Sequence, residues 1–137
     1  MNKAALDNLV KISKLKAEPY DAAEFKGLVQ SAQRRLTDAR NTGLSPESQF
    51  DLAYNAAHAL ALAALRHAGY RSEGRYLVFQ TLAHTIAMPP AKWRVLSKCH
   101  DARNLAEYEG HTEVDAGLLL ELIKIATELE ADVGKLS

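Results

Sequence analysis

The sequence predicts an all-α fold: a compact, mostly antiparallel up-and-down bundle of five to six helices that forms one domain over residues 1–137. Apolar residues recur at spacings of three and four through long windows, and no long window alternates apolar and polar residues as a strand does. A chain of 137 residues has the usual size of one domain and can bury roughly two-thirds of its unfolded surface. The helices are joined by short connections, which favour antiparallel neighbours and exclude a parallel sheet or a barrel.

The first two predicted helices are bounded by proline, aspartate and glycine. The first runs over residues 3–16 with Leu6 facing inward, and it stops before Pro19. The second begins after Asp21, whose carboxylate can accept hydrogen bonds from the free amides of the first turn. The segment Asn41-Thr42-Gly43 ends it, and Gly43 can take the left-handed conformation after a helix.

The third helix is predicted to lie at the centre of the bundle. Ser45 followed by Pro46 is a start signal, and the helix runs to about residue 68, where Gly69 closes it. Small side chains on several sides let neighbouring helices come close, and this helix carries Ala53, Ala56, Ala57, Ala59, Ala61, Ala63 and Ala64. A fourth helix is predicted over residues 73–87.

The last two helices follow a proline break. Pro90 can open the fifth helix, which ends near residue 110. Thr112 and Asp115 have the spacing of a capping box and predict a last helix over residues 113–135. That helix has apolar residues at coiled-coil-like spacing, namely Leu118, Leu122, Ile125, Leu129, Val133 and Leu136.

Composition narrows the classes of function. The 17 basic and 17 acidic residues balance, which argues against a general nucleic-acid coat. The single cysteine, Cys99, falls on an apolar arc and is expected to be a buried hydrophobe.

Long apolar runs and a leader-like start are absent from the sequence, so we expect a cytoplasmic protein without membrane contact. Neither a cofactor nor a metal is predicted, because phosphate loops, dinucleotide fingerprints and ligand-spaced histidine pairs are missing.

The fifth helix carries an unusual density of hydrogen-bonding side chains. At about 100° per residue, His100, Asn104 and Glu107 lie along one narrow stripe, with Arg103 at its edge. A stripe of this kind either forms a ligand site or fixes helix register as a satisfied polar network, because an unpaired buried polar group costs about 1–3 kcal/mol.

A second polar stripe runs along the third helix. Asp51, Asn55 and His58 fall on one side of the cylinder, with Tyr54 and Arg66 beside them. If the third and fifth helices pack together, the two stripes meet and form a cluster of carboxylate, guanidinium, imidazole and amide groups.

Basic residues gather around the turn between the third and fourth helices. Arg66, His67, Arg71 and Arg75 are close in sequence, and arginine offers a bidentate fork to phosphate. The alternative is an ordinary solvated helix end whose basic residues are favoured by the helix dipole.

The chain resembles the HEPN superfamily of small all-helical domains over roughly residues 45–130. The resemblance lies in Phe50 to Ala59 (FDLAYNAAHA), Gly69 to Arg71, Val78 to Leu82, and Arg103-Asn104 through Tyr108. Members are often dimers; many are metal-independent endoribonucleases of toxin–antitoxin or defence systems, and others are noncatalytic subunits that accompany nucleotidyltransferases. The resemblance therefore implies a homodimer that binds RNA or a nucleotide, or a partner that is a nucleotidyltransferase or an antitoxin.

The resemblance departs at the catalytic histidine. In the ribonucleases an Arg is followed after about four to six residues by a His, and the pairs of two protomers converge in a cleft. Arg103 matches that Arg, and Asn104 matches the polar residue after it. Tyr108 occupies the position that four intervening residues give. The next histidine, His111, would join the polar stripe only in an unbroken helix, and Gly110 favours a break.

Cleavage of RNA without metal needs a general base for the 2′-hydroxyl proton and a cation for the charge that develops on phosphorus. Arg103 is the candidate cation, and His100 or His111 would supply the acid or base, because tyrosine with an ordinary pKa of about 10 is a poor base at neutral pH. The candidate catalytic residues are Arg103, Asn104, His111, Tyr108 and His100. The candidate binding residues are Asp51, Asn55, His58, Glu107, Arg71 and Arg75.

Three hypotheses of function follow. The first is a HEPN-like protein that binds nucleotide or RNA phosphate near Arg103, with or without ribonuclease activity. The second is a noncatalytic partner of a nucleotidyltransferase or antitoxin, which the missing His favours. The third is a dimerising scaffold whose polar stripes serve helix register alone.

Overall fold

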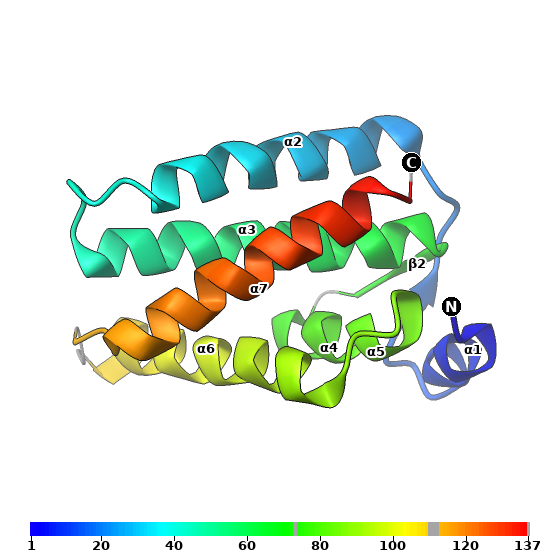
Figure 1. The fold of residues 1–137 in the computed structure, drawn as a ribbon. Helices are drawn as coiled ribbons and strands as arrows, with labels where there is room; N and C mark the ends of the chain where they lie inside the picture. Colours follow the sequence, from blue (N-terminus) through cyan, green and yellow to red (C-terminus); the bar gives the residue numbers. More distant parts are fainter. Residues whose placement is uncertain (73, 110–112, 137) are drawn as a thin grey trace.

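The computed structural model is an all-α bundle, as predicted, and it describes residues 1–136 apart from residue 73 and residues 110–112. The side chains of residues 106–109, at the end of the helix that begins at Pro90, also lie outside that description. The long helices are α2 (Ala22–Ala39), α3 (Pro46–His67), α6 (Pro90–Glu109) and α7 (Ala116–Gly134). They run alternately in opposite directions, and α7 crosses α3 obliquely (Figure 1).

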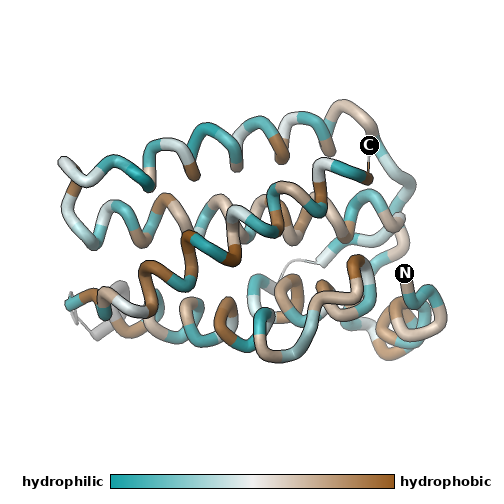
Figure 2. The backbone as a smooth tube through the Cα atoms, in the orientation of Figure 1, coloured by the Kyte–Doolittle hydropathy of each residue, from teal (hydrophilic) through white to brown (hydrophobic). Residues whose placement is uncertain are grey.

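The central position of α3 is confirmed. Its seven alanines from Ala53 to Ala64 are buried, and the helix packs against α2, α4, α6 and α7. Small side chains allow this close approach on several sides. Hydrophobic positions of α2 recur on the side that faces α3, as Figure 2 shows. The core is completed from α7 by Leu122, Ala126, Leu129 and Val133, which are fully buried.

Capping side chains fix the starts of three long helices. Asp21 accepts hydrogen bonds from the amides of Ala23 and Glu24 at 2.9 and 3.1 Å. Ser45 accepts from the amide of Ser48 at 3.1 Å, with Pro46 in the first turn. These two starts agree with the sequence prediction.

The start of α7 differs from the prediction. Asp115 is itself the N-cap and accepts from the amide of Leu118 at 3.0 Å, so the helix begins at Ala116 and not near residue 113. The predicted partner in the capping box, Thr112, lies outside the described residues. Aspartate prefers the cap position to the third helical position, which explains the shift.

The end of α2 lies next to the predicted segment Asn41–Gly43, but Gly43 does not take the left-handed backbone expected of it. The helix ends at Ala39, and the side chain of Asn41 accepts a hydrogen bond from the amide of Gly43 at 2.9 Å. Asparagine therefore makes the turn through its own side chain. Among the described glycines a left-handed backbone occurs at Gly69, whose φ is +94° and which follows the C-cap residue Ala68 of α3.

The first predicted helix is shorter than expected. Helix α1 (Lys3–Lys11) ends where Ser13 takes a φ of +61°, and the next residues form β1 (Lys16–Ala17). This strand pairs antiparallel with β2 (Tyr70–Arg71), so a two-stranded ladder joins the N-terminal segment to the end of α3. A two-residue strand has no periodicity to detect.

The fourth predicted helix is divided into α4 (Arg75–Gln80) and α5 (Leu82–Thr85). Between them Thr81 is buried, and its hydroxyl donates to the carbonyl of Val78 at 2.7 Å. A side chain that bonds its own backbone in this way competes with regular helix. Both short helices cover α3 on the side of α6, so residues of α3, α4 and α6 come together (Figure 1).

None of the described helices combines the length and the apolar composition that a membrane span requires.

Candidate functional site

The two predicted polar stripes meet around one buried tyrosine. We call this group the Tyr54 cluster; it comprises Tyr54, Asn55 and His58 of α3, Arg75 and Tyr76 of α4, and His100, Arg103 and Asn104 of α6. Three separate helices therefore contribute side chains to it, which requires the packing of α4 and α6 against α3.

Tyr54 is the centre of the cluster. Its side chain is fully buried, and its hydroxyl lies 2.8 Å from Nδ1 of His100. The guanidinium carbons of Arg75 and Arg103 lie 5.9 and 5.1 Å from the centre of its ring, within the range of cation–π contact. Burial raises the pKa of the Tyr54 phenol above its ordinary value, so the hydroxyl stays protonated at neutral pH.

His100 is held at both ring nitrogens. Nδ1 faces the hydroxyl of Tyr54, and Nε2 lies 3.2 Å from the amide nitrogen of Asn104. When the amide nitrogen of Asn104 donates to Nε2, Nδ1 of His100 carries the proton and donates it to the Tyr54 hydroxyl. When the amide is flipped, Nε2 donates to the Asn104 oxygen, and Nδ1 accepts from the Tyr54 hydroxyl. In both directions the ring is fixed in place. A ligand hydroxyl reaches a nitrogen of His100 only by replacing one of these partners.

His58 is an uncharged member of the cluster. Burial, followed by the charges of Arg75 and Arg103, lowers its pKa to about 4, so the imidazole is neutral at pH 7. It packs edge-on against Phe79 with ring centres 5.9 Å apart. His58 therefore contributes shape and polarity, and not positive charge, to a ligand site.

Asn55 connects α3 to α4. Its side-chain oxygen accepts a hydrogen bond from Nη1 of Arg75 at 3.3 Å, and its side-chain nitrogen donates to the main-chain carbonyl of Asp51 at 2.9 Å. Asp51 itself is exposed and contributes this carbonyl. Asn55 thus positions the guanidinium of Arg75 beside Tyr54.

The cluster therefore unites six of the sequence-predicted site residues, which are Asn55, His58, Arg75, His100, Arg103 and Asn104. Glu107 and Tyr108 belong to the backbone of α6, but their side chains are outside the described part of the chain, and His111 lies outside the described residues altogether.

Sequence reasoning did not assign Tyr54 or Tyr76 to the site. Tyr54 was placed beside the polar stripe of the third helix, and its central role depends on the crossing of α6 over that position. Tyr76 follows Arg75 in a short helix without periodicity. Its ring centre lies 5.9 Å from that of His100, and its side chain is 46% exposed.

Arg71 and Arg66 belong to a different group, which we call the Arg66 network: Glu18, Glu24, Arg66 and Arg71. Arg66 is only 2% exposed, and its Nε donates to Glu24 at 2.5 Å. Arg71 donates to Glu18 at 2.6 Å and also to Glu24. Arg66 and Arg71 are therefore not free phosphate ligands, because they share the carboxylates of Glu18 and Glu24. Arg75, from the same turn, belongs to the Tyr54 cluster instead.

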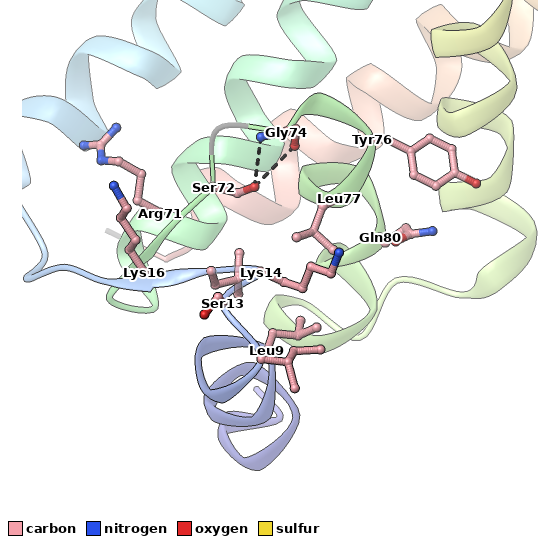
Figure 3. Close-up of a pocket in the computed structure, with 12 residues that line it drawn as sticks. Leu9, Ser13, Lys14, Lys16, Arg71, Ser72, Gly74, Tyr76, Leu77 and Gln80 are labelled. Carbon is pink, nitrogen blue, oxygen red and sulfur yellow. Dashed lines mark hydrogen bonds between the residues drawn. The ribbon is translucent and has the colours of Figure 1, made fainter.

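A cavity of about 650 Å³ lies beside the cluster, between the end of α1, the two strands and α4. Tyr76 is among the residues that line the cavity and also belongs to the Tyr54 cluster; its ring points away from Leu9 and Leu77 in Figure 3. Apolar side chains such as Leu9 and Leu77 line the cavity together with the polar side chains of Ser13, Lys14, Ser72 and Gln80.

Cys99 is a buried core residue, as expected. It is fully buried on α6, and burial raises the pKa of its thiol to about 12. A thiol in this state is no nucleophile at neutral pH. Among the side chains that the structure describes, no three His, Cys, Asp or Glu residues gather as metal ligands.

Comparison of the chain with models of known protein families and with curated proteins finds no match.

Proposed function

We propose that the chain is a HEPN-like RNA-binding protein whose Tyr54 cluster holds an RNA phosphate. The observation that carries the proposal is the convergence of Arg75 and Arg103, from two different helices, on the ring of Tyr54 next to His100.

The chemistry of the cluster suits a phosphate diester. Each guanidinium presents several N–H donors in a planar fork that matches phosphate oxygens. Arg75 is held by Asn55, and both arginines lie against the ring of Tyr54, so their orientation is set before a ligand arrives. Preorganised donors of this kind lose little conformational freedom on binding.

The same arrangement supports metal-independent cleavage of RNA. In this reaction the 2′-hydroxyl replaces the amide of Asn104 at Nε2 of His100, this nitrogen takes its proton, and the 2′-oxygen attacks phosphorus. The 5′-oxygen leaves with the proton that the protonated His100 returns, which gives a 2′,3′-cyclic phosphate and a 5′-hydroxyl end. Arg103 and Arg75 stabilise the charge on the phosphate oxygens during the attack.

Binding is tested with a fluorescent single-stranded RNA in a chelating buffer, by anisotropy. Arg103→Ala and Arg75→Ala each remove a charged donor, worth about 1.5–3 kcal/mol, so we expect each to weaken binding at least about tenfold. Each variant should also reduce the dependence of affinity on salt by about one ion.

Arg94→Ala is the matched control. Arg94 is an exposed arginine of the same helix, and its guanidinium lies over Trp93 and away from Tyr54. An affinity loss in Arg94→Ala equal to that in Arg103→Ala would mean that charge alone matters, and it would refute the proposed site. Cleavage is followed on the same RNA by gel electrophoresis, with His100→Ala as the inactive reference. An RNA that is bound but stays intact limits the function to binding.

The second candidate function is a noncatalytic subunit that pairs with a nucleotidyltransferase or antitoxin. The observation that favours it is Tyr108, which stands where the ribonucleases of the superfamily have histidine. Under this proposal the tagged chain, purified from its host, brings such a protein with it in a fixed ratio. Sedimentation of the pure chain tests the homodimer that the resemblance implies.

A further inference from the structure

We infer that Tyr76 and the cavity beside it form a base-binding subsite next to the phosphate site, so that the preferred ligand is single-stranded RNA. This inference rests on the proposed function and extends it from a phosphate to a nucleotide with an unpaired base.

The position of Tyr76 links the two sites. It directly follows Arg75 in α4, its ring lies at 60° to that of His100 with centres 5.9 Å apart, and it is among the residues that line the cavity. Tyr54, in contrast, is fully buried. Tyr76, at 46% exposed, therefore offers an accessible aromatic surface within one residue of a phosphate-binding arginine.

The cavity has the size and chemistry for a base. Its volume of about 650 Å³ falls in the range of about 300–1,000 Å³ that small-ligand sites occupy. Leu9, Ile12 and Leu77 provide apolar contact for a ring face. The amide of Gln80, a residue that lines the cavity, offers donors and an acceptor to a base edge. The hydroxyl of Ser72 donates to the carbonyl of Gly74 and accepts from its amide, as Figure 3 shows, so it can only accept one further hydrogen bond.

A double-stranded ligand does not fit this arrangement. In a duplex each base face is covered by its neighbours and the pairing edges are occupied, whereas an aromatic side chain needs an unstacked base. The balanced charge of the chain also argues against a surface that is basic throughout. Stacking, together with a few phosphate contacts, is the usual mode of binding to single strands.

The test combines a change in the protein with a change in the RNA. Tyr76→Leu removes the aromatic ring at a half-exposed helical position and keeps an apolar side chain, so the fold should be retained. Loss of one stacking contact is expected to weaken binding of a single-stranded oligonucleotide about 5- to 100-fold. Tyr76→Phe keeps the ring and should bind within about twofold of the wild type.

Abasic RNA makes the test specific to stacking. An oligonucleotide of the same length in which stable abasic spacers replace the nucleotides should bind the wild type about as weakly as the complete RNA binds Tyr76→Leu. The two changes should not add, because both remove the same contact. Gln80→Ala should weaken binding of the complete RNA and leave binding of the abasic RNA unchanged.

Tyr20→Leu is the matched control for the tyrosine. Tyr20 is exposed to a similar degree, 42%, but it packs against Phe25 and His67 and is not among the residues that line the cavity. Its replacement should leave RNA affinity unchanged. Three results would overturn the inference: equal binding of single-stranded and duplex RNA by the wild type, additive effects of Tyr76→Leu and the abasic spacers, or full affinity in Tyr76→Leu.

The outcomes separate this inference from the proposed function. RNA binding that depends on Arg103 but not on Tyr76 retains the phosphate site and rejects the base subsite. If the wild-type protein binds neither single-stranded nor duplex RNA, both the base subsite and the proposed RNA-binding function are overturned.

Discussion

Replacement of Arg66 by methionine should destabilise the fold more than any change of an exposed charge. Arg66 is 2% exposed and donates to Glu24 and to the main-chain carbonyls of Glu18, Pro19 and Tyr70. Removal of one partner from a buried ion pair costs about 3–5 kcal/mol, because the remaining polar groups lose their compensation. Glu24 stays 31% exposed and keeps Arg71 as a partner, which places the expected loss near the lower limit, about 3 kcal/mol.

Urea unfolding followed by circular dichroism at the helix band measures this loss. For a chain of this length the melting temperature should also fall by about 12 °C, at roughly 4 °C per kcal/mol. Arg71→Met is the matched comparison, because Arg71 pairs with the same carboxylates but is 31% exposed. A partly solvated pair contributes about 1 kcal/mol or less. Equal losses in the two variants, or a loss below about 1 kcal/mol in Arg66→Met, would refute the reasoning.

Two further predictions concern buried titratable groups. The pKa of His58 in the folded chain is lowered to about 4. Between pH 7 and pH 5 this histidine therefore binds a proton in the unfolded chain but stays neutral in the folded chain. The free energy of unfolding should fall by about 1–2 kcal/mol as the pH falls through this window. In urea titrations His58→Gln should show a smaller fall than the wild type, and parallel curves for the two proteins would contradict the assignment. Cys99, with a pKa raised to about 12, should not react with a chromogenic disulfide reagent in native buffer and should react fully in urea. Complete reaction of the native protein would show that the thiol is accessible.

Local signals in the sequence predicted those parts of the fold that are decided locally. Ser45-Pro46 and Asp21 mark helix starts because their side chains bond amides only two or three residues away. The alanine run of α3 predicted its central place, because small side chains have no other use on so many sides of one helix. The stripe of His100 and Asn104 was visible for the same reason, as helical spacing alone puts them together.

The parts that sequence reasoning missed depend on contacts between distant residues. Glu24 meets Arg66 across 42 positions, and no local pattern shows which carboxylate an arginine will reach. The pairing of Lys16 with Arg71 likewise spans most of the first half of the chain. Tyr76 belongs to α4, a six-residue helix that ends at the break at Thr81 and packs its side chain into the cluster. Six residues are too few for a helical periodicity to be recognised in the sequence.

The attachment of α1 has a consequence for the cavity beside Tyr76. This helix buries Leu6 alone among its residues. It is joined to the rest by the β1–β2 ladder, by a hydrogen bond from the amide of Asn2 to the carbonyl of His84, and by the hydroxyl of Tyr70, which accepts from Lys3 and donates to Asp7. A segment with so little buried surface opens at a lower free energy than the bundle as a whole. One wall of the cavity can therefore move away while α3, α6 and α7 stay folded, so the entry of a large ligand would leave Arg75 and Arg103 in place.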